Sequence, residues 1–262
     1  MTVKKGDKVV LHKSSEAYSL TGGLKGLDIN CDMGEGMGKD DLIMPYVSSV
    51  NIACGYHAGN EEMMQQTTTL AIQHDVAIGA HPSFLDRENF GRTDMRLPLQ
   101  EVYDLVTAQI YLLNKIVNTS GAVLHHVKPH GALYNMAARA KPLAAVVALA
   151  VKDVNEKLIL YGLSGSHLIS EGKKIGLKTA SEVFADRTYQ ENGRLTPRDK
   201  PDALIEDEKQ AIKQVLQMIG KGTVTCVSGK EIPIVAETIC IHGDGKHAIE
   251  LAKAIYQAVK KA

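Results

Sequence analysis

The sequence predicts an α/β fold, in the form of an irregular seven-stranded (β/α) barrel. Apolar runs of strand length alternate with helical patterns, as a parallel sheet with covering helices requires. In addition, six of the runs carry or lead into polar clusters. In a parallel barrel the carboxyl ends of the strands converge on one rim, so these clusters would share a pocket. A flat doubly wound sheet is the competing architecture, although its polar residues would converge mainly at one switch point.

Seven apolar runs have the length of buried strands. In chain order they are residues 27–30, 50–53, 76–80, 123–127, 158–161, 178–183 and 238–241. Two further runs, 223–227 and 232–235, are joined by a connection too short for a crossover helix. We therefore expect them to pair as an antiparallel hairpin, which makes the barrel irregular.

Helical patterns fill the intervals between the strands. In chain order they cover about residues 60–71, 98–117, 142–155, 166–175, 206–219 and 246–259. Asn60 is a suitable N-cap for the first helix, with Glu61 and Glu62 favourable in its first turn. The second helix begins near Pro98 and has an apolar stripe that should press against the sheet. This stripe consists of Leu99, Val102, Val106, Ile110, Leu113 and Val117.

The length of 262 residues suits one barrel-sized domain, which we expect at residues 25–262. Residues 1–24 are rich in lysine, serine, threonine and glycine, and we interpret them as a flexible N-terminal extension. The four cysteines lack CxxC spacing, so they predict neither a zinc knuckle nor a disulfide framework.

Charge and hydropathy exclude several classes of partner. Thirty basic residues balance thirty acidic ones, which removes the electrostatic footprint that binding to nucleic acid or an anionic membrane needs. No apolar stretch reaches the length of about 18 residues that a membrane span requires, and no run resembles a secretory signal. We therefore expect a cytoplasmic protein with neither a nucleic-acid nor a membrane partner.

Several segments that carry the polar clusters closely resemble the LamB/YcsF family. They are residues 28–35, 51–59, 79–83, 86–92, 127–135, 182–189 and 241–244, in the order found in the family. The match runs from about Leu27 to the C-terminus, and only residues 1–24 depart from it. This family is the A subunit of the bacterial ATP-dependent 5-oxoprolinase. The resemblance implies a seven-stranded β/α barrel of the glycoside hydrolase/deacetylase superfamily, in agreement with the strand count.

The activity that this resemblance implies is the opening of 5-oxoproline to L-glutamate with hydrolysis of ATP. Amide resonance makes the lactam carbonyl a poor electrophile, so ATP must activate it, and phosphorylation of the carbonyl oxygen would do so. The chain lacks the GxxxxGK[ST] loop that cradles phosphates. We therefore expect ATP, with Mg²⁺, to bind mainly to partners that resemble subunits B and C. The present chain would hydrolyse the activated lactam, and whether it binds a metal itself is left open.

The expected catalytic residues follow the strands. Attack by water needs a base, and the crowding of Asp28, Asn30, Asp32 and Glu35 should raise the pKa of one carboxyl. Asp32 is the first choice, although Asp28 or Asn30 alone could equally hydrogen-bond inside the barrel. Imidazoles beyond the strands can exchange protons near neutrality or bind a metal. They are His57 and His81, expected nearest the carbonyl, and His130 and His242, either of which could protonate the leaving nitrogen.

Lys128 completes the expected catalytic set, and a second group of residues is expected to bind the substrate. Lys128 precedes the stiff Pro129 and would stabilise an oxyanion or a phosphoryl group. Arg92 or Arg187 suits the substrate carboxylate through two parallel hydrogen bonds, and either could instead brace a loop. The remaining members of the predicted substrate-binding set are Asp28, Asn30, Glu182, Asp186, His242 and Asp244.

Two other functions remain open at this point. A metal-dependent deacetylase, or another amidohydrolase, would use Asp32, His57 and His81 as ligands of suitable type. These ligands lie on three separate strands, unlike the HxxxH pair of the deacetylase relatives, so a shared fold does not carry the chemistry over. The chain could also be a non-catalytic scaffold for its partners.

Overall fold

A computed structural model describes residues 27–243 and 248–261 of the chain. The expected extension at residues 1–24 and the predicted site residue Asp244 lie outside these described residues. Within them, no helix combines the length and the apolar character that crossing a bilayer demands.

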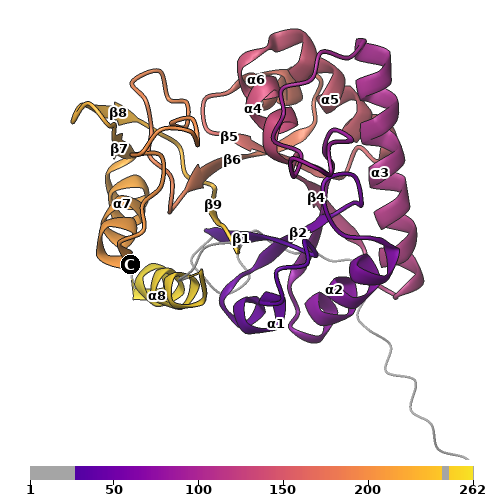
Figure 1. The fold of residues 1–262 in the computed structure, drawn as a ribbon, viewed down its shortest axis with the longest axis horizontal. Coiled ribbons are helices and arrows are strands. Elements are labelled where there is room, and N and C mark those ends of the chain that lie inside the picture. Colours follow the sequence, from indigo (N-terminus) through magenta and orange to yellow (C-terminus); the bar gives the residue numbers. More distant parts are fainter. Residues whose placement is uncertain (1–26, 244–247, 262) are drawn as a thin grey trace, which may run out of the picture.

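Seven parallel strands close into a barrel (Figure 1). They are β1 (Asp28–Met33), β2 (Ser49–Ala53), β3 (Ala77–His81), β4 (Leu124–Val127), β5 (Ile159–Leu163), β6 (Lys178–Phe184) and β9 (Thr238–Ile241). Neighbours in space follow the chain order, and β9 pairs with both β6 and β1, which closes the sheet. The predicted barrel is confirmed, and the closure excludes a flat doubly wound sheet.

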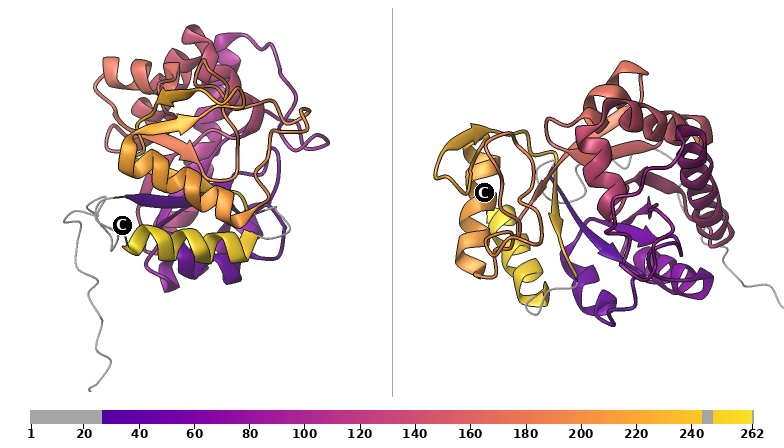
Figure 2. Two further views of the ribbon diagram at one scale, coloured as in Figure 1. Left: turned by 90° about the vertical axis from the view of Figure 1, so that its left-hand side faces the viewer. Right: turned by 45° about the horizontal axis from the view of Figure 1, so that its top comes forward.

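Helices surround the barrel (Figures 1 and 2). They are α1 (Asp40–Ile43), a 3₁₀ turn (Met44–Tyr46), α2 (Glu61–Gln73), α3 (Leu99–Thr119), α4 (Gly131–Arg139), α5 (Lys141–Val154), α6 (His167–Lys174), α7 (Glu208–Lys221) and α8 (Ala248–Lys261). The predicted cap of α2 is confirmed, because the Asn60 side chain accepts from the Met63 N–H at 2.9 Å. The predicted stripe of α3 is buried from Val102 onward, whereas Leu99, in the first turn, is 46% exposed.

Two features complicate the simple alternation. The predicted hairpin is confirmed as the antiparallel pair β7 (Thr223–Thr225) and β8 (Glu231–Pro233), which lies beside α7 (Figures 1 and 2). Helix α4 was not among the predicted helices. Gly131 has a φ of +53°, and an added Cβ would lie 2.4 Å from the Gly91 carbonyl oxygen. Glycine therefore permits a close approach of two loops at this position.

Strand β1 sends alternate side chains to opposite sides of the barrel wall. Its odd-numbered residues belong to the apolar core, whereas Asp28, Asn30 and Asp32 lie on the inner side. The Asn30 amide donates to Thr238 Oγ1 at 2.7 Å, and Asn30 Oδ1 accepts from Asn51 Nδ2 at 2.8 Å. The barrel interior is therefore a hydrogen-bonded polar stack that leads toward Asp32 at the carboxyl end.

A buried imidazole fills the middle of the barrel. The His126 ring stacks on Tyr161 with 4.1 Å between centroids, and His126 Nε2 bonds to Asn51 Oδ1 at 2.9 Å. An added Cβ at Gly79 would lie only 2.1 Å from His126 Nε2. The missing side chain at residue 79 is therefore what makes room for the imidazole.

Candidate active site at the carboxyl end of the barrel

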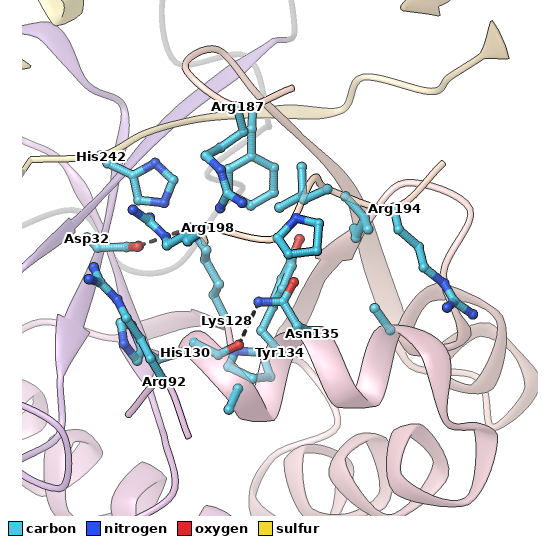
Figure 3. Close-up of a pocket in the computed structure, with 18 of the residues that line it drawn as sticks. Asp32, Arg92, Lys128, His130, Tyr134, Asn135, Arg187, Arg194, Arg198 and His242 are labelled. Atoms are coloured by element: carbon cyan, nitrogen blue, oxygen red, sulfur yellow. Dashed lines mark hydrogen bonds and ion pairs between the residues drawn. The ribbon is translucent and has the colours of Figure 1, made fainter. Parts of the chain in front are cut away.

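A cavity of about 360 Å³ opens at the carboxyl end of the barrel (Figure 3). Asp32, His81 and Phe184 line it from the ends of β1, β3 and β6. Lys128 and His242 line it from the residues directly after β4 and β9. The strand ends thus meet at one pocket. The predicted site residues that line this cavity are Asp32, Glu35, His81, Arg92, Lys128, His130, Arg187 and His242.

The Lys128 ammonium forms the floor of the site and is only 2% exposed. It lies 2.9 Å from Asp32 Oδ1 and 2.8 Å from Glu182 Oε1. It also lies 3.1 Å from Asn30 Oδ1 and 3.0 Å from Cys240 Sγ. Burial by itself lowers the pKa of Lys128, but Asp32, Cys240 and Glu182 outweigh it and raise that pKa well above its ordinary value. The floor therefore carries a permanent positive charge between carboxylates.

The Asp32 carboxyl lies in surroundings that shift its pKa in the opposite direction to the one expected for the base. Its Oδ1 accepts from Asn51 Nδ2 at 2.9 Å, and its Oδ2 lies 3.4 Å from His81 Nε2. Burial raises the pKa of Asp32, but the nearby His81 imidazole and the Lys128 ammonium outweigh burial and hold that pKa well below its usual range. The upward shift expected from crowded acids is therefore not found at Asp32, because cationic and hydrogen-bonding groups surround it. Asp32 is an ionised carboxylate that orients its neighbours.

His242 is held by a second buried carboxylate. The His242 Nδ1 atom lies 2.9 Å from both oxygens of Asp186, and the His242 backbone N–H donates to Asp186 Oδ2 at 3.2 Å. Burial raises the pKa of Asp186, but His242 outweighs burial and lowers that pKa below the ordinary value. An ionised Asp186 fixes the proton on Nδ1, so Nε2 is the ring nitrogen left for chemistry.

Arginines from several elements surround the cavity (Figure 3). Arg187 is 4% exposed and donates to the carbonyl oxygens of Thr196 at 2.6 Å and Ala203 at 3.2 Å, so it braces the loop that follows β6. Burial, followed by the charge of Arg198, lowers the pKa of Arg187 to about 10. Arg194 and Arg198 belong to the same loop and are exposed.

Sequence reasoning missed many residues of this wall, among them two arginines of a loop and two polar residues of a helix. Arg194 and Arg198 lie in the long loop between β6 and α7, well beyond the end of the strand, and no local signal in the sequence marks them. Tyr134 and Asn135 lie on α4, whose existence was not expected. The Tyr134 hydroxyl donates to Glu182 Oε2 at 2.7 Å, so this helix completes the bonding of a buried acid.

The other predicted residues lie behind the cavity lining. Asp28 accepts from the hydroxyls of Ser49 at 2.8 Å, Thr238 at 2.6 Å and Tyr161 at 3.1 Å, at the opposite end of β1. Four residues apart on one strand is a separation of about 13 Å, so Asp28 does not crowd Asp32. The remaining residues of this kind that the structure describes are Asn30, His57, Glu182 and Asp186.

Three histidines and one glutamate form a cluster at one side of the cavity. Glu35 Oε1 lies 3.2 Å from His57 Nε2 and 3.7 Å from His130 Nδ1. His130 Nδ1 lies 2.9 Å from His81 Nε2. Burial, followed by His81, lowers the pKa of His57 to about 2, and burial with the other imidazoles lowers that of His130 well below its ordinary value. The deacetylase alternative grouped Asp32 with His57 and His81. His81 does lie 3.4 Å from Asp32, whereas His57 lies 3.2 Å from Glu35.

Comparison with known proteins places the chain among a set of named relatives. The model of the LamB/YcsF family matches residues 27–262. A protein of Brevibacillus brevis, named as the A subunit of 5-oxoprolinase, is 51% identical over 244 residues, which is 91% of this chain and 96% of that protein. A protein of the same name from Geobacillus kaustophilus is 53% identical over 241 residues, with 90% and 94% covered.

Solved structures agree with the barrel. A lactam utilization protein from Thermus thermophilus matches with a TM-score of 0.83 and 40% identity, over 90% of this chain and 96% of that chain. A putative cellobiose-phosphate cleavage protein from Enterococcus faecalis matches with a TM-score of 0.53 and 18% identity, over 90% and 92%. The second likeness extends to the fold alone.

Proposed function

The chain belongs to the LamB/YcsF family, and we propose that it opens the lactam ring of 5-oxoproline as the hydrolytic subunit of an ATP-dependent 5-oxoprolinase. The names of its relatives suggest the reaction. The observation that carries the proposal is the cavity, in which Asp32, Lys128 and His242 face a mouth rich in arginine. Its volume of about 360 Å³ is in the range that small-molecule sites have.

The proposed chemistry begins with a lactam whose carbonyl oxygen carries a phosphoryl group. Water adds to that carbon and gives a tetrahedral adduct. Loss of phosphate from the adduct would return the lactam, whereas departure of the ring nitrogen gives an acyl phosphate that a second water converts to glutamate and phosphate. The nitrogen leaves only if it is protonated, so a placed proton donor decides which bond breaks.

The residues of the cavity suit these steps. Asp32 is ionised and accepts a hydrogen bond from the attacking water, while Lys128 holds the carboxylate in place at 2.9 Å. His242, oriented by Asp186 through Nδ1, is proposed to take a second proton on Nε2 as water adds and to deliver it to the leaving nitrogen. We assign this donor role to His242 and not to His130, because burial keeps the His130 imidazole neutral.

The arginines suit a doubly anionic substrate. The activated lactam carries a carboxylate and a phosphoryl group, and guanidinium groups bind both through paired hydrogen bonds. Arg92, Arg194 and Arg198 line the cavity and are proposed to bind these groups. Arg187 is committed to the carbonyl oxygens of its own loop, so we propose a bracing role for it.

Nucleotide binding is proposed to belong to partner subunits. The chain has no GxxxxGK[ST] loop, and the relatives are named as one subunit of an enzyme, which implies other subunits. We propose partners that resemble subunits B and C, which would bind ATP with Mg²⁺ and pass the phosphorylated lactam to this cavity.

The test is reconstitution. The purified chain is mixed with the presumed partners, and glutamate formed from 5-oxoproline and ATP is measured with each component omitted in turn. Full activity without this chain would contradict the proposal. Asp32→Asn should abolish most glutamate release while the complex still forms on size exclusion. Asp104→Asn, on the exposed side of α3, is the matched control and should keep the activity. Unchanged release by Asp32→Asn would refute the role of that carboxylate.

A further inference from the structure

The histidine cluster has a hydrogen-bond pattern that determines where its protons lie. The outer nitrogen of each ring faces an atom that accepts. His81 Nδ1 lies 2.7 Å from the Lys128 carbonyl oxygen, and His130 Nε2 lies 2.8 Å from the Phe90 carbonyl oxygen. A carbonyl oxygen has no hydrogen to donate, so both of these outer nitrogens carry the proton.

The third ring follows the same rule through a hydroxyl. His57 Nδ1 lies 2.9 Å from Ser83 Oγ. That hydroxyl donates its hydrogen to the Phe84 carbonyl oxygen at 2.9 Å, so it accepts from His57. Each ring that carries a single proton therefore has it on the outer side and a lone pair on the inner side. The inner nitrogen of His81 also lies 3.4 Å from Asp32 Oδ2.

The inner atoms converge with a carboxylate oxygen. They are His57 Nε2, His81 Nε2, His130 Nδ1 and one oxygen of Glu35, and all four lie within 4.8 Å of one another. The inner nitrogens of His81 and His130 lie 2.9 Å apart, and Glu35 Oε1 lies 3.2 Å from His57 Nε2. Acceptors aimed at one point repel each other unless a positive charge lies between them.

From this convergence we propose that Glu35, His57, His81 and His130 bind one divalent transition-metal ion, with Zn²⁺ the best match. Imidazole nitrogen and carboxylate oxygen are ligands that Zn²⁺ takes in a tetrahedron. Metal–ligand bonds of about 2.0–2.1 Å place tetrahedral ligand atoms about 3.4 Å apart. The ligand atoms of His130 and His81 lie 2.9 Å apart, those of Glu35 and His57 lie 3.2 Å apart, and those of Glu35 and His130 lie 3.7 Å apart, on either side of that spacing.

The surroundings have the features that metal-binding histidines need. A ligating imidazole usually donates its other N–H to a carbonyl oxygen, a carboxylate or water, which fixes the tautomer. His57 and His81 are each 1% exposed and His130 is 6% exposed, so few waters compete for the inner nitrogens. The four residues lie at the carboxyl ends of β1, β2, β3 and β4. An ion would therefore cross-link four neighbouring strand ends and stabilise the rim.

The inference rests on the described geometry and does not need the proposed lactam chemistry. Its test uses the untagged full-length chain alone, so its outcome is separate from any assay of glutamate release. The chain is dialysed against chelator, then titrated with ZnSO₄ by calorimetry, and bound zinc is counted by mass spectrometry. We expect one Zn²⁺ per chain, a higher thermal midpoint with zinc, and visible absorption bands of a tetrahedral site when Co²⁺ replaces it.

Single substitutions locate the ion. His57→Gln and Glu35→Gln should each weaken Zn²⁺ affinity by about a hundredfold or more, because each removes a direct ligand. His74→Gln, which changes an exposed histidine at the end of α2, is the matched control and should bind zinc normally. Circular dichroism of each variant establishes that it is folded, and Glu35→Gln keeps the side-chain volume should His57→Gln unfold.

Two results would overturn the proposal. One is a wild-type chain that takes up less than stoichiometric zinc, cobalt, manganese, nickel and iron. The other is full affinity in both His57→Gln and Glu35→Gln. If zinc binding is lost in His242→Gln but kept in both His57→Gln and Glu35→Gln, the proposal is also overturned. The ion would then lie in the neighbouring group formed by Asp32, Cys240 and His242.

Discussion

Substituting Lys128 by methionine tests the electrostatics of the floor of the site. Methionine keeps the length of the side chain but removes the ammonium, which leaves Asp32 and Glu182 without a cation that lies 2.9 and 2.8 Å away. Removing one partner of a buried ion pair costs about 3–5 kcal/mol. For a chain of this size each kcal/mol lowers the thermal midpoint by about 2–4 °C, so we expect a fall of about 10 °C.

The loss of stability in Lys128→Met should depend on pH, and the direction of this dependence follows from the ionisation of Asp32. In the wild type the pKa of Asp32 is held below its unfolded value of about 3.9, so the ionised carboxylate stabilises the fold above that pH and loses this contribution on acidification. Without the ammonium, the folded pKa of Asp32 rises from its wild-type value, while His81 still lowers it. The Asp32 carboxyl of the variant therefore takes up a proton, and loses its uncompensated buried charge, at a higher pH than in the wild type. The deficit of Lys128→Met is therefore largest at neutral pH and shrinks as the pH falls.

The assay is thermal unfolding followed by circular dichroism at about pH 7 and about pH 5, where the difference between variant and wild type is compared. Lys141→Met is the matched control, since its ammonium pairs with Glu171 at 3.7 Å and is 63% exposed. Exposed pairs contribute about 0.2–1 kcal/mol, so the control should melt within about 4 °C of the wild type. A deficit for Lys128→Met that matches the control, or one that does not change with pH, would refute this reasoning.

Four further substitutions probe other parts of the molecule. Asp186→Asn should lower kcat for glutamate release about a hundredfold with KM little changed, because the neighbouring imidazole loses its ionised partner, and steady-state kinetics of the reconstituted complex would show this. Gly79→Ala should lower the thermal midpoint by several degrees, since its Cβ would lie 2.1 Å from a buried ring. Gly220→Ala, which meets nothing within 4 Å, should instead stabilise α7 by about 0.5–1 kcal/mol. Arg198→Met should raise KM about tenfold, most strongly at low salt, and an effect that is equal in high salt would contradict an electrostatic role.

The strands were predictable because each is a short apolar run bounded by polar or glycine residues. Such a run can be recognised from neighbouring residues in the sequence alone. Helix α4 was not, because its start depends on a contact distant in sequence. Gly131 approaches the Gly91 carbonyl, and the Ala132 N–H donates to that same oxygen at 2.9 Å. Nothing local to Pro129 and Gly131 indicates that another loop takes up the first N–H groups of a helix.

The convergence of polar residues on one rim was predictable for the same topological reason, whereas their partners were not. Asp28 and Asp32 lie four residues apart on one strand, with the same side-chain type and orientation. Yet Asp28 accepts from hydroxyls at one end of the barrel, and Asp32 lies beside an ammonium at the other. The environment of each carboxylate depends on residues from other strands. The crowding of acids in the sequence predicted a raised pKa for the base, whereas the pKa of Asp32 is lowered.

The same limit explains why the histidines needed coordinates before their role could be argued. Sequence spacing places His57, His81 and His130 after strands, where proton transfer and metal binding are both open to an imidazole. The two functions differ in which ring nitrogen carries the proton. The partners that hold the outer protons of His81 and His130 are the backbone carbonyl oxygens of Lys128 and Phe90. Every residue type has a backbone carbonyl oxygen. Because a backbone carbonyl leaves no trace in residue identity, a proton relay and a metal site are indistinguishable in the sequence and become distinguishable once the loops are placed in space.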